Sequence, residues 1–284
     1  MVQLTERDRA IIRLVHRHRF LRSSHIISLA GGSPQQILRR LQLLFHHEFL
    51  ERPRIQIEYY HLGGSREIVY GLGKEGVSLL KREAGAEARS LDVEENVDFP
   101  HRIFFEHALL VSDVMVALEL SCRKTEGVRL RAGEELPLPG GVRRKIKWTV
   151  KVNNRVLLGV IPDRVFAIES KDESPGLLFL EADRGTMPIV RDDLIQSSFF
   201  RKLLAYEAIW TQGLHNSQFG FPRFRVLTVT TSAARAESLV KACLRLKSGH
   251  GLFLFADHAA LQKHGDLLTF PWKTGRGEIA KLLL

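Results

Sequence analysis

Three carboxylates stand beside apolar segments that have the character of buried strands. Asp163 opens the run DRVFAIE, and Glu181 and Asp183 close the run LLFLEAD. Because side chains alternate across a sheet, Glu181 and Asp183 project from the same face. A hairpin folded at KDESPG, residues 171–176, lays Asp163 next to Glu181. The sequence therefore predicts that the three carboxylates meet at one end of a sheet.

Like charges gathered at one place repel each other unless a positive group neutralises them. That group is either a hard divalent cation or a basic side chain such as Lys202 or an arginine. Oxygen ligands of this kind select Mg²⁺ or Mn²⁺ over zinc. The alternative reading is a Pro-Asp turn at Asp163 and a strand end with solvated acids, one of them paired with Arg184.

The elements that carry these carboxylates form the second half of the chain. A long helix at 104–124 comes first, with Glu106, His107 and Asp113 among apolar residues, and short strands follow after Gly127. The pattern then continues as helix, strand, helix and strand. This order predicts a mixed sheet covered on both faces, an α+β or α/β fold over residues 101–284.

The first part of the chain has a different pattern. Helices are expected from Thr5, from Ser23 and from Ser33, the last with Pro34 at its first position. A strand is expected over 50–62, where Ile55, Ile57 and Tyr59 alternate, followed by a glycine-containing turn and a second strand. Three helices and a hairpin predict a winged helix-turn-helix over residues 1–84, and the small, acidic segment 85–100 is predicted to be a linker.

Charge supports contact between this first region and a polyanion. The chain carries a net charge of +10, and residues 1–60 hold ten arginines, no lysine and five acids. Arginine suits bidentate contacts with phosphate and guanine. The predicted contacts with double-stranded DNA are Ser33, Gln35, Gln36, Arg39 and Arg40 on the third helix, and Arg66 on the wing. The alternative is a module of the same shape that binds protein.

The remaining composition excludes several protein classes. Two cysteines, Cys122 and Cys243, give neither a disulfide framework nor metal-ligand spacing. The N-terminus lacks a signal-peptide core, and no segment approaches 18 apolar residues. We therefore expect a bacterial cytoplasmic protein with no membrane association.

Two resemblances follow from these motifs. Pro-Asp, a loop and an apolar strand ending in Glu resemble the PD-(D/E)XK nuclease superfamily, although Asp183 stands where the lysine of Glu-x-Lys would be. The ordered set LTERDRAIIRLVHRHRFLRSSHI, RRLQLLF, YGLGKEG, HALLVSDV, PDRVF, FLEADRGT and Lys202-x-x-x-Tyr206 is similar to the plasmid replication-relaxation family. That resemblance covers residues 4 to about 210, and EADRGT is its sharpest element.

The resemblance to the PD-(D/E)XK nucleases implies roles for particular residues. Asp163 and Glu181 would hold Mg²⁺ or Mn²⁺, with Asp183 as a third ligand and Lys202 as a lysine relocated to the following helix. Glu106 would add a carboxylate, and His107 would accept a proton or serve as a hydrogen-bonded core residue. Arg184 and Thr186 would contact phosphate or shape the turn.

The sequence leaves three functions open. The first is a metal-dependent DNA endonuclease or nicking protein of plasmid or mobile-element DNA processing, targeted by its winged helix. The second is a non-catalytic DNA-binding initiator, accessory factor or repressor whose second domain mediates dimerisation or partner docking. The third is an interaction module in a defence or mobile-element complex. Expected partners are double-stranded DNA, a second copy of the chain, and replication, conjugation or defence proteins.

Overall fold

The computed structural model describes residues 3–60, 67–84, 102–136, 146–152, 156–171 and 176–283, and its fold class is α+β, as the sequence predicts. The chain divides into two compact units, Met1–Val116 and Ala117–Leu284. The boundary between these units falls inside helix α6 (Arg102–Lys124). The predicted linker 85–100 lies outside the described residues.

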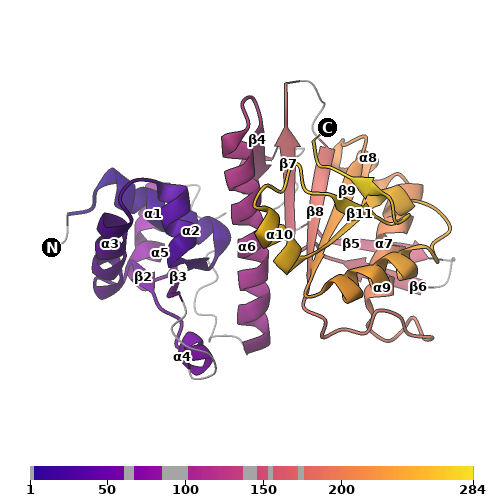
Figure 1. The fold of residues 1–284 in the computed structure, drawn as a ribbon, viewed down its shortest axis with the longest axis horizontal. Helices are drawn as coiled ribbons and strands as arrows, with labels where there is room; N and C mark the ends of the chain where they lie inside the picture. Colours follow the sequence, from indigo (N-terminus) through magenta and orange to yellow (C-terminus); the bar gives the residue numbers. More distant parts are fainter. Residues whose placement is uncertain are drawn as a thin grey trace. The chain divides into compact units, whose positions relative to one another are not determined.

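The first unit contains four longer helices, one short helix and a small sheet (Figure 1). Its elements are α1 (Glu6–His18), β1 (Leu21–Arg22), α2 (Ser23–Ala30), α3 (Pro34–His46), β2 (Leu50–Glu51), α4 (Ile55–Tyr60), β3 (Val69–Leu72) and α5 (Lys74–Ala84), and α6 begins in it. The three strands are antiparallel in the order β1-β3-β2. Apolar stripes of α1, α2 and α3 form its core, which includes Ile12, Ile26 and Leu41.

Two details of this unit differ from the sequence prediction. The predicted strand over 50–62 is wrong, because only Leu50 and Glu51 pair with β3, and Ile55–Tyr60 forms α4. Pro53 has no N–H to offer a ladder. The Gln56 amide bonds β3 instead: Nε2 donates to the Val69 carbonyl (3.1 Å), and Oε1 accepts the Val69 N–H (2.9 Å). On α3, the helical spacing of apolar residues predicts that Leu38 faces inward, but its side chain is 44% exposed.

The first half of α6 belongs to the first unit because its contacts lie there. Phe105 joins an apolar cluster with Phe20, and the two rings meet edge to face at 5.3 Å. The Ser112 hydroxyl donates to the His18 carbonyl, and Arg22 pairs with Asp113 through Nε at 2.9 Å. These contacts explain why the first half of α6 belongs to the first compact unit.

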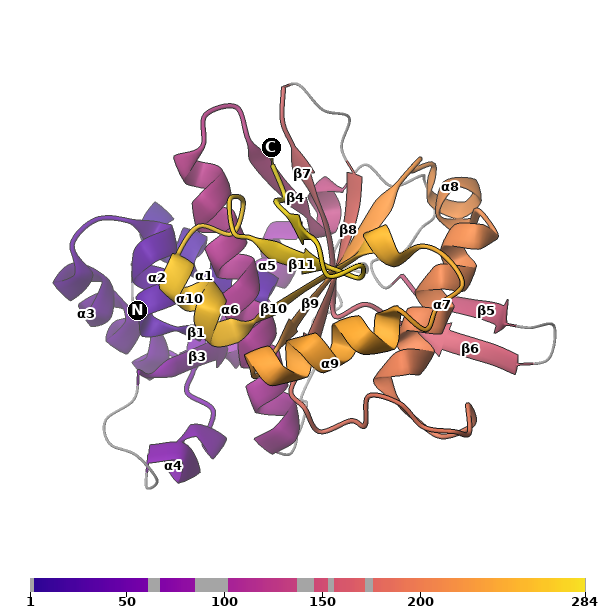
Figure 2. The same cartoon turned by 45° about the vertical axis from the view of Figure 1, so that its right-hand side comes forward.

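The second unit is built on a seven-stranded mixed sheet (Figure 2). In sheet order the strands are β12 (Ile279–Ala280), β11 (Trp272–Thr274), β10 (Phe253–Asp257), β9 (Phe224–Thr230), β8 (Gly176–Asp183), β7 (Arg164–Glu169) and β4 (Arg129–Ala132). The central strands β8, β9 and β10 are parallel, and the other neighbouring pairs are antiparallel. The hairpin of β5 (Trp148–Val152) and β6 (Val156–Val160) is separate from this sheet.

One face of the central strands changes from apolar to polar along its length. Helices α7 (Phe199–Thr211) and α9 (Ala233–Cys243) pack on this face, and the β5–β6 hairpin packs on α7. The apolar part includes Phe179 of β8, which stacks on Tyr206 of α7 at 5.8 Å. Toward the carboxyl ends of β8 and β9 the same face carries Glu181 opposite Thr228 and Asp183 opposite Thr230. The apolar layer between the sheet and helices α7 and α9 therefore ends in a row of buried polar side chains.

The second unit is completed by α8 (Leu214–Phe219) and α10 (His258–His264). The last turns of α6 are tied to it through Ser121, whose hydroxyl accepts the N–H of Leu267. Within the part of the chain that the structure describes, none of the helices combines the length and apolar character needed to cross a membrane.

Candidate functional site

Asp163 lies beside Glu181, where the hairpin prediction places it. Strands β7 and β8 pair with Arg164 opposite Leu180. One step before this pair, the Asp163 N–H donates to the Leu180 carbonyl (3.0 Å), and Asp163 Oδ2 accepts the N–H of Ala182 (2.7 Å). These two bonds hold Asp163 directly opposite Glu181, so two carboxylates from adjacent strands share one face.

Glu181 is buried, with 1% of its surface exposed, and α7 supplies a donor to each of its oxygens. Lys202 Nζ lies 2.5 Å from Oε2, and the Tyr206 hydroxyl donates to Oε1 at 2.6 Å. Lys202 and Tyr206 are four residues apart and so lie on one side of the helix. The spacing of the Lys-x-x-x-Tyr motif therefore brings both of its side chains to the same carboxylate, that of Glu181.

The pKa values of this group reflect burial and charge together. Burial raises the pKa of Glu181, and the neighbouring Asp163 raises it further, against the opposing effect of Lys202. Burial lowers the pKa of Lys202, but Glu181 and Asp163 outweigh it, so the pKa ends above its ordinary value. Burial and the nearby Glu181 raise the pKa of Tyr206 well above 10.0. At neutral pH, Lys202 is therefore an ammonium and Tyr206 a neutral hydrogen-bond donor.

Asp183 has a different cation. Arg235, in the first turn of α9, donates from Nε to Oδ2 (2.5 Å) and from Nη2 to Oδ1 (2.9 Å), and the Thr230 hydroxyl donates to Oδ2 (2.7 Å). The sequence allows an unspecified arginine for the cluster and suggests Arg184 as a partner of one acid, whereas the arginine that binds Asp183 is Arg235. The position of Arg235 in the sequence, just after β9, does point to this pairing. Because β9 is parallel to β8, the helix that follows β9 begins at the edge of the sheet where β8 ends with Asp183.

The hydrogen bonds that each carboxylate already accepts indicate which of them could bind a divalent cation. Asp163 and Glu181 are adjacent oxygen donors, the chemistry that Mg²⁺ and Mn²⁺ prefer, and they fit. Both oxygens of Asp183, the predicted third ligand, are bound, as are both oxygens of Glu181. Asp183 is the poorer candidate because the guanidinium of Arg235 binds both of its oxygens, whereas the Lys202 ammonium contacts one oxygen of Glu181. Among the described residues, no group of three or more His, Cys, Asp or Glu side chains has the arrangement of a metal site.

The predicted accessory residues are divided between the two units. Arg184 follows Asp183 directly and is half-buried, and Thr186 is exposed. Glu106 and His107 are half-buried on the part of α6 that belongs to the first unit. The carboxylates lie in the second unit.

Helix α3 presents most of the predicted DNA contacts on its surface. Ser33 precedes the helix and is exposed, as are Gln35, Gln36 and Arg39. Gln42 and His46 continue the exposed face of Arg39 at helical spacing. Arg66 lies outside the described residues.

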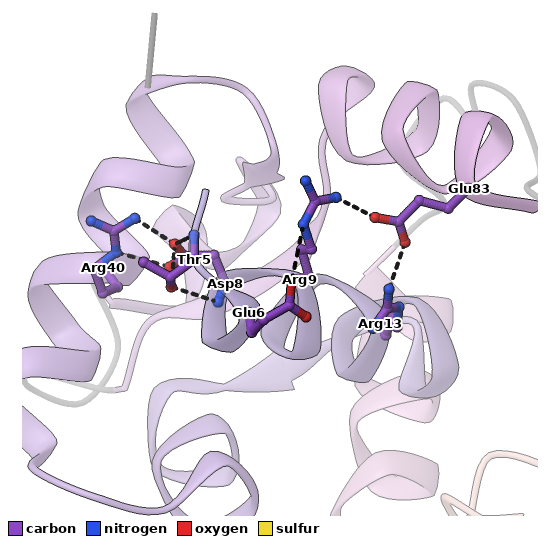
Figure 3. A network of polar contacts seen from close by, with 7 residues as sticks. All are labelled: Thr5, Glu6, Asp8, Arg9, Arg13, Arg40 and Glu83. Carbon is purple, nitrogen blue, oxygen red and sulfur yellow. Dashed lines mark hydrogen bonds and ion pairs between the residues drawn. The ribbon is translucent and has the colours of Figure 1, made fainter. Parts of the chain in front are cut away.

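Arg40 is placed differently from Arg39. Its guanidinium holds Asp8 of α1, with Nε 2.8 Å from Oδ1 and Nη2 2.5 Å from Oδ2, as Figure 3 shows. Asp8 also accepts from the Thr5 hydroxyl at 2.7 Å in the capping box of α1. The side chain that links α3 to α1 is therefore Arg40, and Arg39 is the arginine on the exposed face of α3.

The model of one protein family, described as replication-relaxation, matches residues 12–223, about three quarters of the chain. The chain belongs to the replication-relaxation family. This membership connects it with replication or processing of plasmid or mobile-element DNA. Searches of curated proteins and of solved structures found no match to the chain.

The replication-relaxation match covers most of the residues described above. It includes α3, the β7–β8 hairpin and α7, and with them Asp163, Glu181 and Lys202. Asp8 precedes the matched range and Arg235 follows it. The cation of Asp183 is thus supplied by a part of the chain outside the family match.

Proposed function

We propose that this replication-relaxation protein binds double-stranded DNA through its first unit and hydrolyses a phosphodiester bond at the Asp163–Glu181–Lys202 cluster of its second unit. The observation that carries the proposal is the convergence of two adjacent carboxylates and an ammonium at one sheet end. Two acids and a lysine are the groups that a metal-assisted phosphodiester hydrolysis requires, and the order of strands and helix resembles the PD-(D/E)XK nucleases.

The roles follow from the chemistry of each side chain. Asp163 and Glu181 would hold Mg²⁺ or Mn²⁺, and such a cation, when bound, polarises the phosphate and lowers the pKa of water. Lys202 has 28% of its side chain exposed, so its ammonium can approach a phosphate oxygen as negative charge develops there. Tyr206 keeps Glu181 in place by its hydrogen bond to Oε1. Arg184 and Thr186 would bind flanking phosphates.

The first unit would deliver the DNA as a winged helix-turn-helix. The face of α3 formed by Gln35, Arg39, Gln42 and His46 is exposed and polar, and Gln and Arg are the side chains that read adenine and guanine edges. Arg66 of the wing would contact phosphate. Arg40 would act indirectly, because its pairing with Asp8 fixes α3 on α1.

A second candidate function is a DNA-binding initiator, accessory factor or repressor without cleavage activity, whose second unit serves dimerisation or partner docking. A specific observation favours it: the protein's own donors already occupy both oxygens of Glu181 and both of Asp183. In such a protein Lys202 and Arg235 would be permanent counter-ions.

Nicking of supercoiled plasmid separates the two candidates. With Mg²⁺ or Mn²⁺ the wild type should convert supercoiled to open-circular DNA, and EDTA should stop it. Asp163→Asn and Glu181→Gln should abolish nicking while leaving DNA binding intact. Lys241→Ala, which removes an exposed cation of α9, is the matched control and should retain activity. Binding without nicking by the wild type would refute hydrolysis and support the second candidate.

A further inference from the structure

Arg235 makes contacts beyond its pairing with Asp183. The same Nη2 that binds Asp183 also donates to the Met187 carbonyl (2.6 Å). Between these two acceptors the chain turns at Gly185, whose φ is +76°. A Cβ added there would lie 3.5 Å from Arg235 Nε and 3.4 Å from the Thr231 hydroxyl, so the turn passes close against the arginine. Arg235 therefore fixes the segment that leaves the end of β8.

That segment caps the helix that carries Lys202. The first N–H groups of a helix have no partner within it, and those of Phe199 and Phe200 donate to the carbonyls of Pro188 (2.9 Å) and Ile189 (2.8 Å). The ordinary capping residue, Ser198, makes no side-chain cap bond. The chain at 187–189 is thus the N-terminal cap of α7, and its position sets the course of the first turn.

The hydrogen bonds of the intervening residues 190–198 are mostly local, while Val190 packs against the apolar core of the second unit. Asp193 Oδ1 accepts the N–H of Ile195 (2.8 Å), and Arg201 donates to the Ile195 carbonyl (2.9 Å). The Ile195 side chain is 81% exposed. Among the described hydrogen bonds, those of Arg235 to Met187 and Asp183 connect the 187–189 segment to the end of β8.

We propose that Arg235 is a positioning residue for Lys202: it holds Met187 against Asp183, so that the 187–189 segment caps α7 and Lys202 reaches Glu181. The role of Lys202 in hydrolysis rests on the proposed function, but its placement by Arg235 does not. Arginine suits the task because its planar fork binds both oxygens of Asp183 and the Met187 carbonyl together. A lysine could pair with Asp183 but could not span all three acceptors.

Amide hydrogen exchange in the full chain tests the proposal at the capped groups. In Arg235→Lys, which keeps the positive charge, the N–H groups of Phe199 and Phe200 should exchange at least about tenfold faster than in wild type, because a lost cap opens the first turn. The N–H of Val226 in the sheet should be unchanged, which separates this effect from general unfolding. Arg235→Ala should give the same pattern if it folds, and Lys241→Ala should give none.

Acylation of lysine amines provides a second readout that does not require cleavage. In Arg235→Lys, Lys202 should react several-fold faster than in wild type, and the exposed Lys241 should react at an unchanged rate. If the Phe199 and Phe200 amides and the Lys202 amine all behave as in the wild type, the positioning role is wrong.

Nicking kinetics separate this inference from the proposed function. If the wild type nicks DNA, Arg235→Lys should lower kcat and leave KM unchanged, because Lys202 acts in the reaction and not in binding. Equal kcat would overturn the positioning role. If the wild type does not nick, the proposed hydrolysis fails, and the exchange and acylation results still decide whether Arg235 places Lys202.

Discussion

The two units each bury an acid that pairs with a base from a later helix, and the two pairs behave in opposite ways. Asp8 of the first unit is held by Arg40, and Glu181 of the second by Lys202. Both acids are inaccessible, with 0% and 1% of their surface exposed. Burial raises the pKa of both carboxyls, but that of Asp8 ends below its ordinary value and that of Glu181 ends above.

The difference lies in how many donors surround each carboxylate. Asp8 receives Arg40, the Thr5 N–H and the Thr5 hydroxyl, and these bonds outweigh its burial. Among the described residues, Glu181 receives hydrogen bonds from Lys202 and Tyr206, and it has the like charge of Asp163 beside it. A fully satisfied acid stabilises a fold, whereas an incompletely compensated acid in a buried group is typical of functional sites. The comparison favours a structural role for Asp8 and is consistent with the chemical role proposed for Glu181.

The two pairs should differ most in the free energy of unfolding that is lost when the basic side chain is replaced. Lys202→Met leaves Glu181 buried beside Asp163 without a cation, and removal of one partner of a buried pair costs about 3 to 5 kcal/mol. Arg40→Met leaves Asp8 with its two Thr5 donors and should cost about 1 to 2 kcal/mol. Urea denaturation at pH 7 measures both. Equal losses would remove the distinction between the two acids.

The pH dependence of stability should have opposite signs at the two acids. The lowered pKa of Asp8 means that its contribution is complete above 3.8 and is lost as the pH falls through the pKa of the folded state. The raised pKa of Glu181 means that the folded protein loses stability as the pH rises above 4.5 through the folded-state pKa. Lys202 stays charged in this range, because its pKa lies above 10.5.

Denaturation from pH 3 to pH 8 tests these signs. The stability difference between wild type and Asp8→Asn should grow as the pH rises through the acid range. The difference between wild type and Glu181→Gln should shrink over the corresponding range above 4.5. Parallel curves for the two variants would show that the acids are in equivalent environments.

Adjacent arginines on α3 should differ in DNA binding. Arg39 is exposed, and its replacement by alanine should weaken binding by about 1 to 3 kcal/mol if it contacts a base. Arg40→Ala should weaken DNA binding less and lower the unfolding free energy more, because its guanidinium binds Asp8. Anisotropy titrations at several salt concentrations measure both, with Arg276→Ala in the exposed β11–β12 turn as the control. A flat salt dependence would argue against DNA as the partner.

The smallest expected effects concern the hydroxyls that accompany each pair. Tyr206→Phe keeps the ring in the core and removes one hydrogen bond to Glu181, which should cost about 1 kcal/mol. Thr5→Ala removes the cap of α1 and should cost about the same. The variants should differ in activity: Tyr206→Phe should reduce nicking because Glu181 is less well held, and Thr5→Ala should not. Thermal melts and the plasmid assay together distinguish them.

Much of the fold follows from local patterns in the sequence. The stripe of Ile37, Leu41 and Leu44 fixed the inner face of α3, and strict alternation in LLFLEAD put Glu181 and Asp183 on one face. The strand predicted at 50–62 failed because Ile55 and Ile57 alternate without a partner strand. Pairing with β3 ends at Glu51, and a glutamine side chain takes over. When side-chain hydrogen bonds replace the backbone hydrogen bonds of a strand in this way, the sequence shows no periodic pattern that reveals it.

The site was predictable only where neighbouring strands or one helix turn bring residues together. Hairpin register places Asp163 beside Glu181, and spacing by four aligns Lys202 with Tyr206. The pairing of Asp183 with Arg235 depends on a crossover from β9 to α9, and that of Asp8 with Arg40 depends on the packing of α3 on α1. These tertiary contacts decide which cation neutralises each acid, and no local spacing encodes them.

The most direct measurement for the proposed site is anomalous diffraction from crystals soaked in Mn²⁺. The account predicts a single manganese bound by the carboxylates of Asp163 and Glu181, with Asp183 still paired to Arg235. Manganese absent from this pair at a saturating concentration, or bound instead by Asp183, would contradict it.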